Sequence, residues 1–258
     1  HADSIGALPY ILRKYDIPVF GSQLSIELAK IEVQRENKHR KNSLFHVIDA
    51  DTEIDFKNAS ISFFHTTHSI PDSLGIDVHT PEGEIVYTGD FKFDPTAAKN
   101  YHTDMDRLAE IEHRGVLALL SDSSNAEASF PNASEQDIGN FVTNVFRNAK
   151  GRIIVAAKAS NLNRVQEVLN AAKATGKRVL LTGRDLAKIV RTSMKLGYLD
   201  VPDGLLMRVK DLKTVPNNKT VILETGRMGE PLNSLQKMAK KRHSMITIHK
   251  GDSVFIAT

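Results

Sequence analysis

The sequence contains no cysteine and no tryptophan. Without cysteine there can be no disulfide framework and no thiolate metal site, so any metal must be held by His, Asp or Glu. A run of eighteen apolar residues is also missing, and no charged-then-apolar leader opens the chain, so we expect a cytoplasmic protein without a membrane span. What is present is typical of a globular chain with one large domain or two: 258 residues, 41% of them hydrophobic and 25% charged.

Charges and histidines are distributed unevenly along the chain. Residues 1–129 carry 12 Lys and Arg against 21 Asp and Glu, a net charge of −9, whereas residues 130–258 carry 22 against 10, a net charge of +12. Eight of the 10 histidines lie in the acidic half. Most histidines are plain surface residues, but this grouping with carboxylates suits a metal-binding unit, and the basic half suits a polyanion. The asymmetry predicts two units with different roles.

The first half begins with helices and continues with short strands. Apolar residues at helical spacing predict helices at 4–15 and 23–35, separated by a short buried strand at 18–20. Partial alternation then predicts a mostly antiparallel β region. Its strands are expected at 44–48, 59–66, 75–79 and 84–88, followed by a helix at 103–113 and an apolar strand at 116–120.

The second half alternates strands and helices. A capping signal at 132–135 predicts a helix that runs to about residue 148. Strands are then expected at 152–157, 178–181 and 219–224, and helices at 161–174, 185–196 and from about 232. Repeated β–α alternation predicts a parallel sheet with helical crossovers. The change of pattern places a domain boundary between residues 125 and 134.

Four residues near the ends of predicted elements could hold a metal ion. His1 and Asp3 immediately precede a predicted helix. His68 follows one predicted strand, and Asp90 follows another after Gly89, which permits a sharp turn. Taken singly, each residue has a plain interpretation, since Asp is a good N-cap residue and a Gly-Asp pair is often a turn. Their combination in the histidine-rich half favours a metal site of imidazole and carboxylate ligands.

Five segments spread over essentially the whole chain form a specific ordered set of motifs. They are residues 1–10, 67–73, 87–94, 120–125 and 225–231. Together they resemble the ribonuclease J family, which belongs to the metallo-β-lactamase superfamily and carries a β-CASP insertion. The resemblance implies an α/β fold. Residues 1–130 would form part of an αββα-type metallo-β-lactamase domain, and residues 131–258 part of a β-CASP domain with a parallel sheet.

The resemblance also implies roles for the candidate metal residues. His1, Asp3, His68 and Asp90 would be metal ligands, with the first histidine of the family's H-x-H-x-D-H motif just upstream of His1. Asp90 would bridge two metals, Zn²⁺ or Mn²⁺, and the bridged metals lower the pKa of a water that attacks a phosphodiester. Asp122 would support His1 or His68 from a second layer. The implied catalytic residues are Asp3, Asp90 and Asp122.

Three departures from the family pattern affect this expectation. Ser4 stands where the metal motif ends in His, and a neutral hydroxyl is a poor ligand, so one metal site is expected and the second is disfavoured. Arg227 and Met228 replace two small or polar residues in the family's T-G-S-Q-G-E-P loop. Asn163 stands where active relatives commonly have His. Together these changes resemble a degenerate second ribonuclease J paralogue that accompanies an active one.

The basic half offers candidate contacts for a phosphate. A helix that begins near Asn161 would present backbone N–H groups beside the Ser160 hydroxyl, and the loop 225–231 would present amides at the same edge of the sheet. An ordinary crossover turn is the plain alternative for both. The candidate substrate-binding residues are Ser160, Asn161, Arg164, Thr225, Gly226 and Arg227. The cations at 237–242 are expected to form a solvated helix face, with RNA contact as the less favoured alternative.

Two functions follow from the resemblance. The first is a metal-dependent ribonuclease in RNA processing and decay, acting as a 5′–3′ exonuclease, an endonuclease or both, with activity weakened by Ser4. The alternative is a mainly non-catalytic, RNA-binding subunit in a complex with an active ribonuclease J paralogue, as Ser4, Asn163 and Arg227 favour. The expected partners are RNA and either a second copy of the chain or that paralogue. A small-molecule hydrolase of the same superfamily is disfavoured by the large basic second half.

Overall fold

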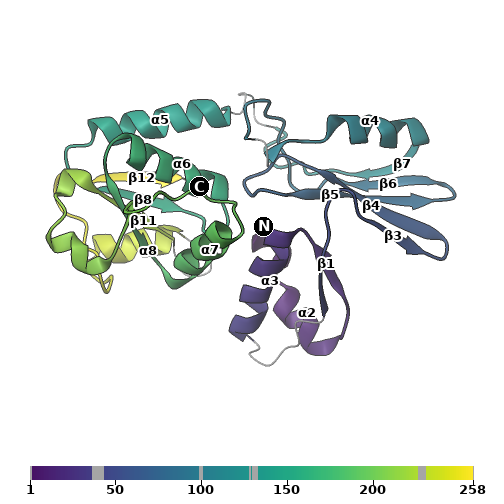
Figure 1. Cartoon of the computed structure of the whole chain (residues 1–258), viewed down its shortest axis with the longest axis horizontal. Coiled ribbons are helices and arrows are strands. Elements are labelled where there is room, and N and C mark those ends of the chain that lie inside the picture. Colours follow the sequence, from purple (N-terminus) through teal and green to yellow (C-terminus); the bar gives the residue numbers. More distant parts are fainter. Residues whose placement is uncertain are drawn as a thin grey trace. The chain divides into compact units, whose positions relative to one another are not determined.

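The computed structural model forms two compact units, His1–Glu135 and Gln136–Thr258. The structure describes residues 2–36, 44–98, 101–127, 129, 133–225 and 231–257. Figure 1 shows helices and a β-sheet in each unit, and we describe each unit by itself. The α/β class predicted from the sequence is confirmed. The domain assignments to residues 1–130 and 131–258 stay predictions.

The first unit opens with helices α1 (Ala2–Ile5), α2 (Leu8–Lys14) and α3 (Gln23–Glu36). A single helix over 4–15 is a wrong prediction, because the chain turns at Gly6 and Ala7, and Pro9 occupies the first turn of α2, where its missing N–H is not needed. Strands β1 (Val19–Gly21) and β2 (Phe45–Val47) pair in parallel. The strand expected to be buried is half exposed, since Phe20 is 44% exposed and stacks on His46.

The main sheet of the first unit has the order β3-β4-β5-β6-β7. Its strands are β3 (Glu53–Phe56), β4 (Ala59–His65), β5 (Leu74–Thr80), β6 (Gly83–Tyr87) and β7 (Val116–Leu120). The first four are antiparallel neighbours, in agreement with the mostly antiparallel region predicted, and β7 pairs in parallel with β6. The strand expected at 44–48 is an exception, because it is β2, which pairs in parallel with β1 outside this sheet. Strand β3 was not predicted. Strand β7 is apolar as expected, but each of its residues is exposed in this structure.

Helix α4 (Met105–Arg114) covers one face of this sheet. Its Ile111 packs with Phe64 and Val86 in a buried cluster. Gly75 is required beside this cluster, because a Cβ there would lie 2.2 Å from the Phe64 ring. At the end of α4, Arg114 donates hydrogen bonds to the buried carboxylates of Asp77 and Glu84, at 2.7 and 2.6 Å. The helix is therefore fixed to the β5–β6 hairpin by both apolar and ionic contacts.

The second unit contains a five-stranded, fully parallel sheet with the order β10-β9-β11-β8-β12. The alternation of strands and helices in the sequence predicted a parallel sheet here. The strands are β8 (Ile153–Ala157), β9 (Arg178–Thr182), β10 (Leu206–Met207), β11 (Thr220–Glu224) and β12 (Ser253–Ala257). The helices are α5 (Glu135–Asn148), α6 (Leu162–Ala174), α7 (Arg184–Lys195) and α8 (Pro231–Ala239), with short 3-10 turns at Val209–Lys213 and Asn217–Lys219. The edge strands β10 and β12 were not predicted.

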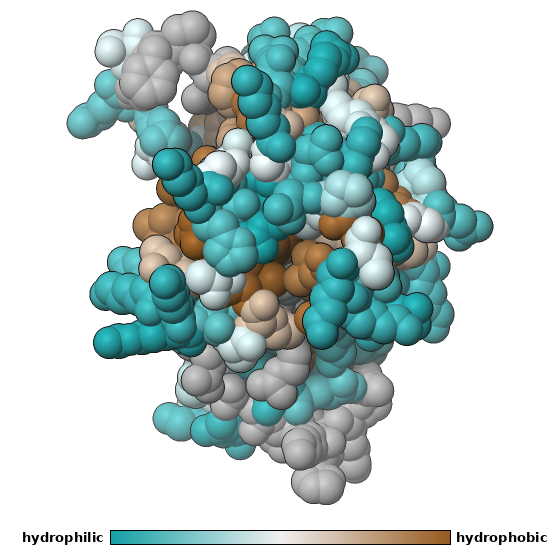
Figure 2. Space-filling model, turned by 90° about the vertical axis from the view of Figure 1, so that its left-hand side faces the viewer, coloured by the Kyte–Doolittle hydropathy of each residue, from teal (hydrophilic) through white to brown (hydrophobic). Residues whose placement is uncertain are grey.

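The core of the second unit lies on both faces of this sheet. Every residue of β8 and β11 is buried. Figure 1 draws α5 and α8 on opposite sides of the sheet, and Leu235 and Met238 of α8 pack against Ile154 and Ile222. Seen from the left-hand side of Figure 1, hydrophilic side chains dominate the surface, with apolar groups visible between them (Figure 2).

Strand β12 is fixed to β8 by a buried ion pair. The Arg152 guanidinium donates to both carboxylate oxygens of Asp252, at 3.0 and 2.5 Å, and to the Thr247 carbonyl oxygen at 2.7 Å. Close backbone contact accompanies this pair, since a Cβ at Gly151 would lie 2.1 Å from the Gly251 carbonyl oxygen. The amino ends of the two strands are thus held by side-chain and backbone packing together.

Candidate functional site

Three loops meet at one end of the first sheet, where β4, β6 and β7 have their carboxyl ends. They carry His68, Asp90 and Asp122, respectively. Backbone hydrogen bonds join them: Lys92 N donates to the Thr67 carbonyl at 2.8 Å, and Thr88 N donates to the Leu120 carbonyl at 3.1 Å. The Asp122 amide also donates to the Thr88 hydroxyl at 3.1 Å. The carboxyl edge of the first sheet therefore brings together residues far apart in sequence.

His68 and Asp90 lie side by side at this edge. The Nε2 atom of His68 is 4.0 Å from Oδ2 of Asp90, and their side chains are 22% and 43% exposed. Hydrogen bonds from the side chain and amide of Ser124 lower the pKa of Asp122, with smaller contributions from the Phe91 amide and the charge of His68. His68 and Asp90 thus present an imidazole and a carboxylate, both partly exposed, and Asp122 lies close enough to interact with His68.

The donor chemistry of this edge fits Zn²⁺ or Mn²⁺, both of which accept imidazole nitrogen and carboxylate oxygen. Among the described residues, however, no three His, Asp or Glu side chains are grouped as a metal site. His68 and Asp90 would be two of the ligands. His1 lies outside the described residues, and of Asp3 only the backbone is described, so the full ligand set stays a prediction.

The backbone of Asp3 differs from the expected one. A loop position before the first helix was predicted, but α1 begins at Ala2 and Asp3 lies within it. Ser4 also belongs to α1 and is exposed. The expected loop position of Asp3 is therefore a wrong prediction at the level of the backbone.

Asp94 is a buried carboxylate near this edge that the sequence analysis missed. It accepts hydrogen bonds from the amide and hydroxyl of Thr96 and from the Glu135 amide, at 2.8, 2.6 and 2.7 Å. Burial alone would raise the pKa of Asp94, but these hydrogen bonds and one from Lys92 lower it to about 2. The Asp-x-Thr spacing, which is typical of Asx turns, is the sequence signal that could have indicated it.

The second candidate edge is the carboxyl end of the parallel sheet in the second unit. Ser160 and Thr225 are buried there, 5% and 3% exposed. Gly183 lies beside Thr225, since a Cβ on Gly183 would be 3.0 Å from the Thr225 carbonyl oxygen. The loops after β8, β9 and β11 therefore share one edge, as predicted for a parallel sheet. Gly226 and Arg227 lie outside the described residues.

Two predicted phosphate contacts have other partners in the structure. The Asn161 side chain caps α6, with Oδ1 accepting from the Arg164 amide at 2.9 Å. The Arg164 guanidinium pairs with the Glu167 carboxylate, one helical turn further along. The charge of Arg164 is thus compensated within α6, a pairing that the i,i+3 spacing on a helix could have indicated.

Glu224 is a second buried carboxyl group that the sequence analysis missed. It is 2% exposed at the end of β11, and one oxygen accepts from the Ser234 hydroxyl at 2.5 Å. The other oxygen has no hydrogen bond in the described part of the chain. Burial raises the pKa of Glu224 to about 7, against a smaller lowering by the Ser234 hydrogen bond. A lone acid in the apolar strand at 219–224 was the available signal.

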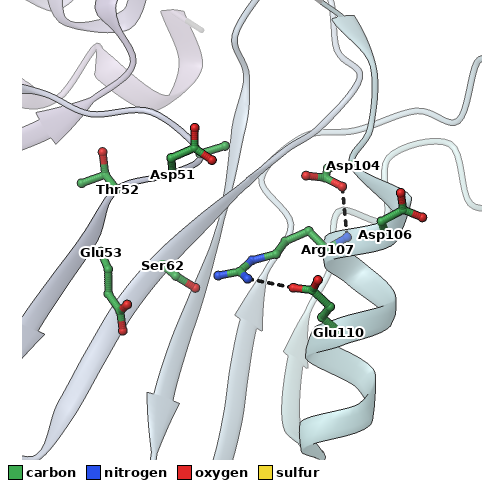
Figure 3. Close-up of a pocket in the computed structure, with 9 residues that line it drawn as sticks. Asp51, Thr52, Glu53, Ser62, Asp104, Asp106, Arg107 and Glu110 are labelled. Atoms are coloured by element: carbon green, nitrogen blue, oxygen red, sulfur yellow. Dashed lines mark hydrogen bonds and ion pairs between the residues drawn. The ribbon is translucent and has the colours of Figure 1, made fainter.

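A separate hollow of about 350 Å³ lies between β3, β4 and the start of α4 (Figure 3). Its polar lining residues are Asp51, Thr52, Glu53, Ser62, Asp104, Asp106, Arg107 and Glu110. Figure 3 shows Arg107 pointing across the hollow, where it pairs with Glu110 at 2.8 Å. None of the candidate site residues lines this hollow, so it is not the predicted site.

None of the described helices has the length and hydropathy needed to cross a bilayer.

Comparisons with known proteins show which proteins this chain is similar to. Residues 150–258 match the family described as "Ribonuclease J, beta-CASP domain". The chain is 54% identical over 259 residues to "Ribonuclease J 2" of Streptococcus pyogenes serotype M3, and 42% identical over 257 residues to proteins of that name from Staphylococcus epidermidis and Staphylococcus aureus. All of this chain is covered in each case, but it spans only 47%, 46% and 46% of those relatives.

A solved structure supports the fold. A protein of unknown function from Enterococcus faecalis V583 superposes with a TM-score of 0.60 at 14% identity, covering 93% of this chain and 64% of that one. At this identity the likeness concerns the fold alone. The family match and the identity over the whole chain carry the assignment, and they agree with the five motifs found in the sequence. The chain belongs to the ribonuclease J family.

Proposed function

We propose that this chain carries the metal-binding and substrate-binding parts of a ribonuclease that acts in RNA processing and decay. The observation that supports this most is the meeting of His68, Asp90 and Asp122 at one sheet edge, with His68 and Asp90 4.0 Å apart. Zn²⁺ or Mn²⁺ would be held by these two residues together with His1 and Asp3. When bound, the metal would supply an activated water for attack on a phosphodiester bond.

The chain's own residues would orient this chemistry. The Asp122 carboxylate attracts the His68 ring and is itself held by Ser124 and the Phe91 amide. A carboxylate in this position favours one ring orientation and makes the imidazole a better ligand. In the second unit, the Ser160 and Thr225 hydroxyls and the backbone amides that open α6 would contact the RNA phosphates, with Gly226 and Arg227 as further candidates.

Reduced activity is part of the proposal. Ser4 offers a hydroxyl where the family motif has an imidazole, so one metal would be retained and the second would bind weakly or not at all. The alternative is a mainly non-catalytic, RNA-binding subunit, either as a homodimer or together with an active ribonuclease J paralogue. Ser4 favours it, as do Asn163 and Arg227, which replace the residues of active relatives. The curated relatives named above carry the name "Ribonuclease J 2".

The test is metal content and degradation of 5′-monophosphorylated RNA by the full-length protein. Three variants are compared with the wild type: Asp90→Ala, Ser4→His and Asp55→Ala. Asp55 is an exposed carboxylate near the β3–β4 turn, at the opposite end of the sheet, and serves as the matched control. The enzyme proposal predicts that Ser4→His raises activity, Asp90→Ala abolishes it and Asp55→Ala leaves it unchanged.

The other outcomes decide against the enzyme proposal. Wild-type activity that persists without metal, or that survives Asp90→Ala, contradicts it. If the wild type binds RNA and the paralogue but neither metal nor turnover is detected, the subunit alternative is supported. Two measurements separate the two assemblies. Copurification with the paralogue indicates the mixed complex, and a homodimer mass by light scattering indicates self-association.

A further inference from the structure

Helix α7 presents a row of three cations on its outer face. Lys188, Arg191 and Lys195 are each exposed and are spaced three and four residues apart, so they lie on one side of the helix. The opposite side is buried against the sheet through Leu186, Ile189, Val190 and Ser193. The three cations therefore lie on the exposed face of a helix whose other face is packed in the core. We call these three residues the α7 stripe.

The charges of the α7 stripe are not compensated within the described part of the second unit. No hydrogen bond or ion pair of Lys188, Arg191 or Lys195 occurs among the described residues. By contrast, Arg164 pairs with Glu167 and Arg152 pairs with Asp252. Three neighbouring uncompensated cations repel one another, and an anion bound along the row would relieve that repulsion.

The α7 stripe starts close to the candidate substrate edge. Helix α7 begins immediately after Gly183, which lies against Thr225 at that edge. At about 1.5 Å per residue, Lys188 lies roughly 6 Å from the start of the helix and Lys195 about 10 Å beyond it. That length matches about three phosphates of a stacked strand. The cations at 240–242 differ, because they follow the carboxyl end of α8, which is the end away from the candidate substrate edge.

We propose that the α7 stripe binds the backbone of single-stranded RNA that extends beyond the candidate substrate edge. The inference rests on the proposed function in that the ligand is RNA. Helix α7 contains no aromatic residue on which a base could stack, so the contact is to phosphates and is independent of sequence. The α7 stripe should therefore increase the affinity for long RNA. It should not change the affinity for oligonucleotides that are too short to extend beyond the candidate substrate edge.

The experiment measures binding of 5′-monophosphorylated RNA of increasing length to the full-length protein, as a function of salt. The variant is the triple replacement Lys188→Ala, Arg191→Ala and Lys195→Ala. The matched control is Lys237→Ala, Lys240→Ala and Lys241→Ala, which removes the same charge elsewhere in the second unit. A conservative variant, Lys188→Arg with Lys195→Arg, keeps the charge and should bind as the wild type does.

We expect the α7 triple variant to bind long RNA about tenfold more weakly or worse at low salt. Each lost phosphate contact lowers the salt dependence of log K by about 0.7, so the slope should fall by about 2. Binding of very short oligonucleotides should stay unchanged, and the control should show the smaller loss. If the two triple variants bind long RNA equally, the inference is overturned while the proposed function stands. If the wild type binds no RNA of any length, the proposed function itself is overturned.

Discussion

The carboxyl edges of the two sheets carry opposite kinds of chemical group. The first edge gathers His68, Asp90 and Asp122, which attract cations. The second edge gathers buried hydroxyls and helix amino ends, with the uncompensated cations of α7 leading away from it. Under the proposed function, the same topological position would serve a metal in one unit and a phosphate chain in the other. Damage to each edge should therefore affect different steps, turnover for the first and binding for the second.

The two units also differ in how they treat a buried carboxyl group. Asp94 receives several hydrogen bonds and its pKa falls to about 2, whereas Glu224 receives one and its pKa rises to about 7. Both side chains are buried, so the number of donors decides which protonation state folding favours. The stability of the two units should therefore depend on pH in opposite directions.

The largest expected effect is the loss of the ion pair between Arg152 and Asp252. Arg152→Ala leaves the buried Asp252 carboxylate without its partner, which should destabilise the second unit by about 3–5 kcal/mol. Hydrogen exchange of β8 and β12 amides measures the loss unit by unit. The double replacement Arg152→Ala with Asp252→Ala should recover part of it. A loss below about 1 kcal/mol for the single variant would show that the pair does not hold the strands together.

Glu224 should make the second unit less stable as pH rises. Its folded pKa of about 7 lies above the ordinary 4.5, so the folded state is fully favoured below pH 4.5 and loses stability up to about pH 7. The shift corresponds to about 3 kcal/mol. Glu224→Gln should flatten this dependence and be the more stable form at pH 8, measured by urea unfolding at pH 5 and 8. If Glu224→Gln left the pH dependence of unfolding unchanged, Glu224 would not be the group responsible for it.

Asp94 should show the opposite sign in the first unit. Its folded pKa of about 2 lies below the ordinary 3.8, so its contribution is present above pH 3.8 and is lost as pH falls toward 2. The expected contribution is about 2 kcal/mol. Asp94→Ala should therefore remove it at neutral pH while leaving the Glu224 dependence in place. Hydrogen exchange of the β4 and β5 amides measures this loss of stability in the first unit. A loss of stability confined to the second unit would contradict the prediction.

A smaller effect is expected for Asp122→Ala, which leaves the proposed ligands in place. Removing a carboxylate that orients a ligating histidine typically lowers metal affinity or activity about 10–100-fold. The measurement is RNA degradation as a function of added Zn²⁺ or Mn²⁺, with Asp55→Ala as the control. Full activity at every metal concentration would remove Asp122 from the site.

Much of this organisation could be predicted from the sequence. Alternation of strands and helices indicated the parallel sheet, because parallel strands are joined by helical crossovers. The strands themselves are continuous apolar runs, as is typical of buried parallel strands. His68 and Asp90 were expected to share a metal site because both follow predicted strands, and the family resemblance added Asp122. The structure shows that the three preceding strands end on the same side of the sheet. Short edge strands such as β3, β10 and β12 were missed, since a few residues show no reliable alternation.

Other features depended on contacts that no local pattern encodes. The break between α1 and α2 depends on Gly6 and on how Pro9 enters the second helix. The pKa of Glu224 depends on its burial, which raises it, and on the opposing hydrogen bond from Ser234, 10 residues away on α8. The pairing of Arg164 with Glu167 is different, because their i,i+3 spacing could have indicated it, yet the charge of Arg164 was assigned to a phosphate. Polar partners set by packing are therefore the part of the site that sequence reasoning resolved least.

The central claim is that turnover and RNA binding reside in different units. Single-turnover degradation of 5′-monophosphorylated RNA, followed over a range of concentrations of the full-length protein, tests it most directly. Asp90→Ala should lower the maximal rate at least about a hundredfold with unchanged half-saturation. The α7 triple variant should raise half-saturation about tenfold with an unchanged maximal rate. A normal maximal rate for Asp90→Ala, or a loss of maximal rate in the α7 variant, would contradict this division.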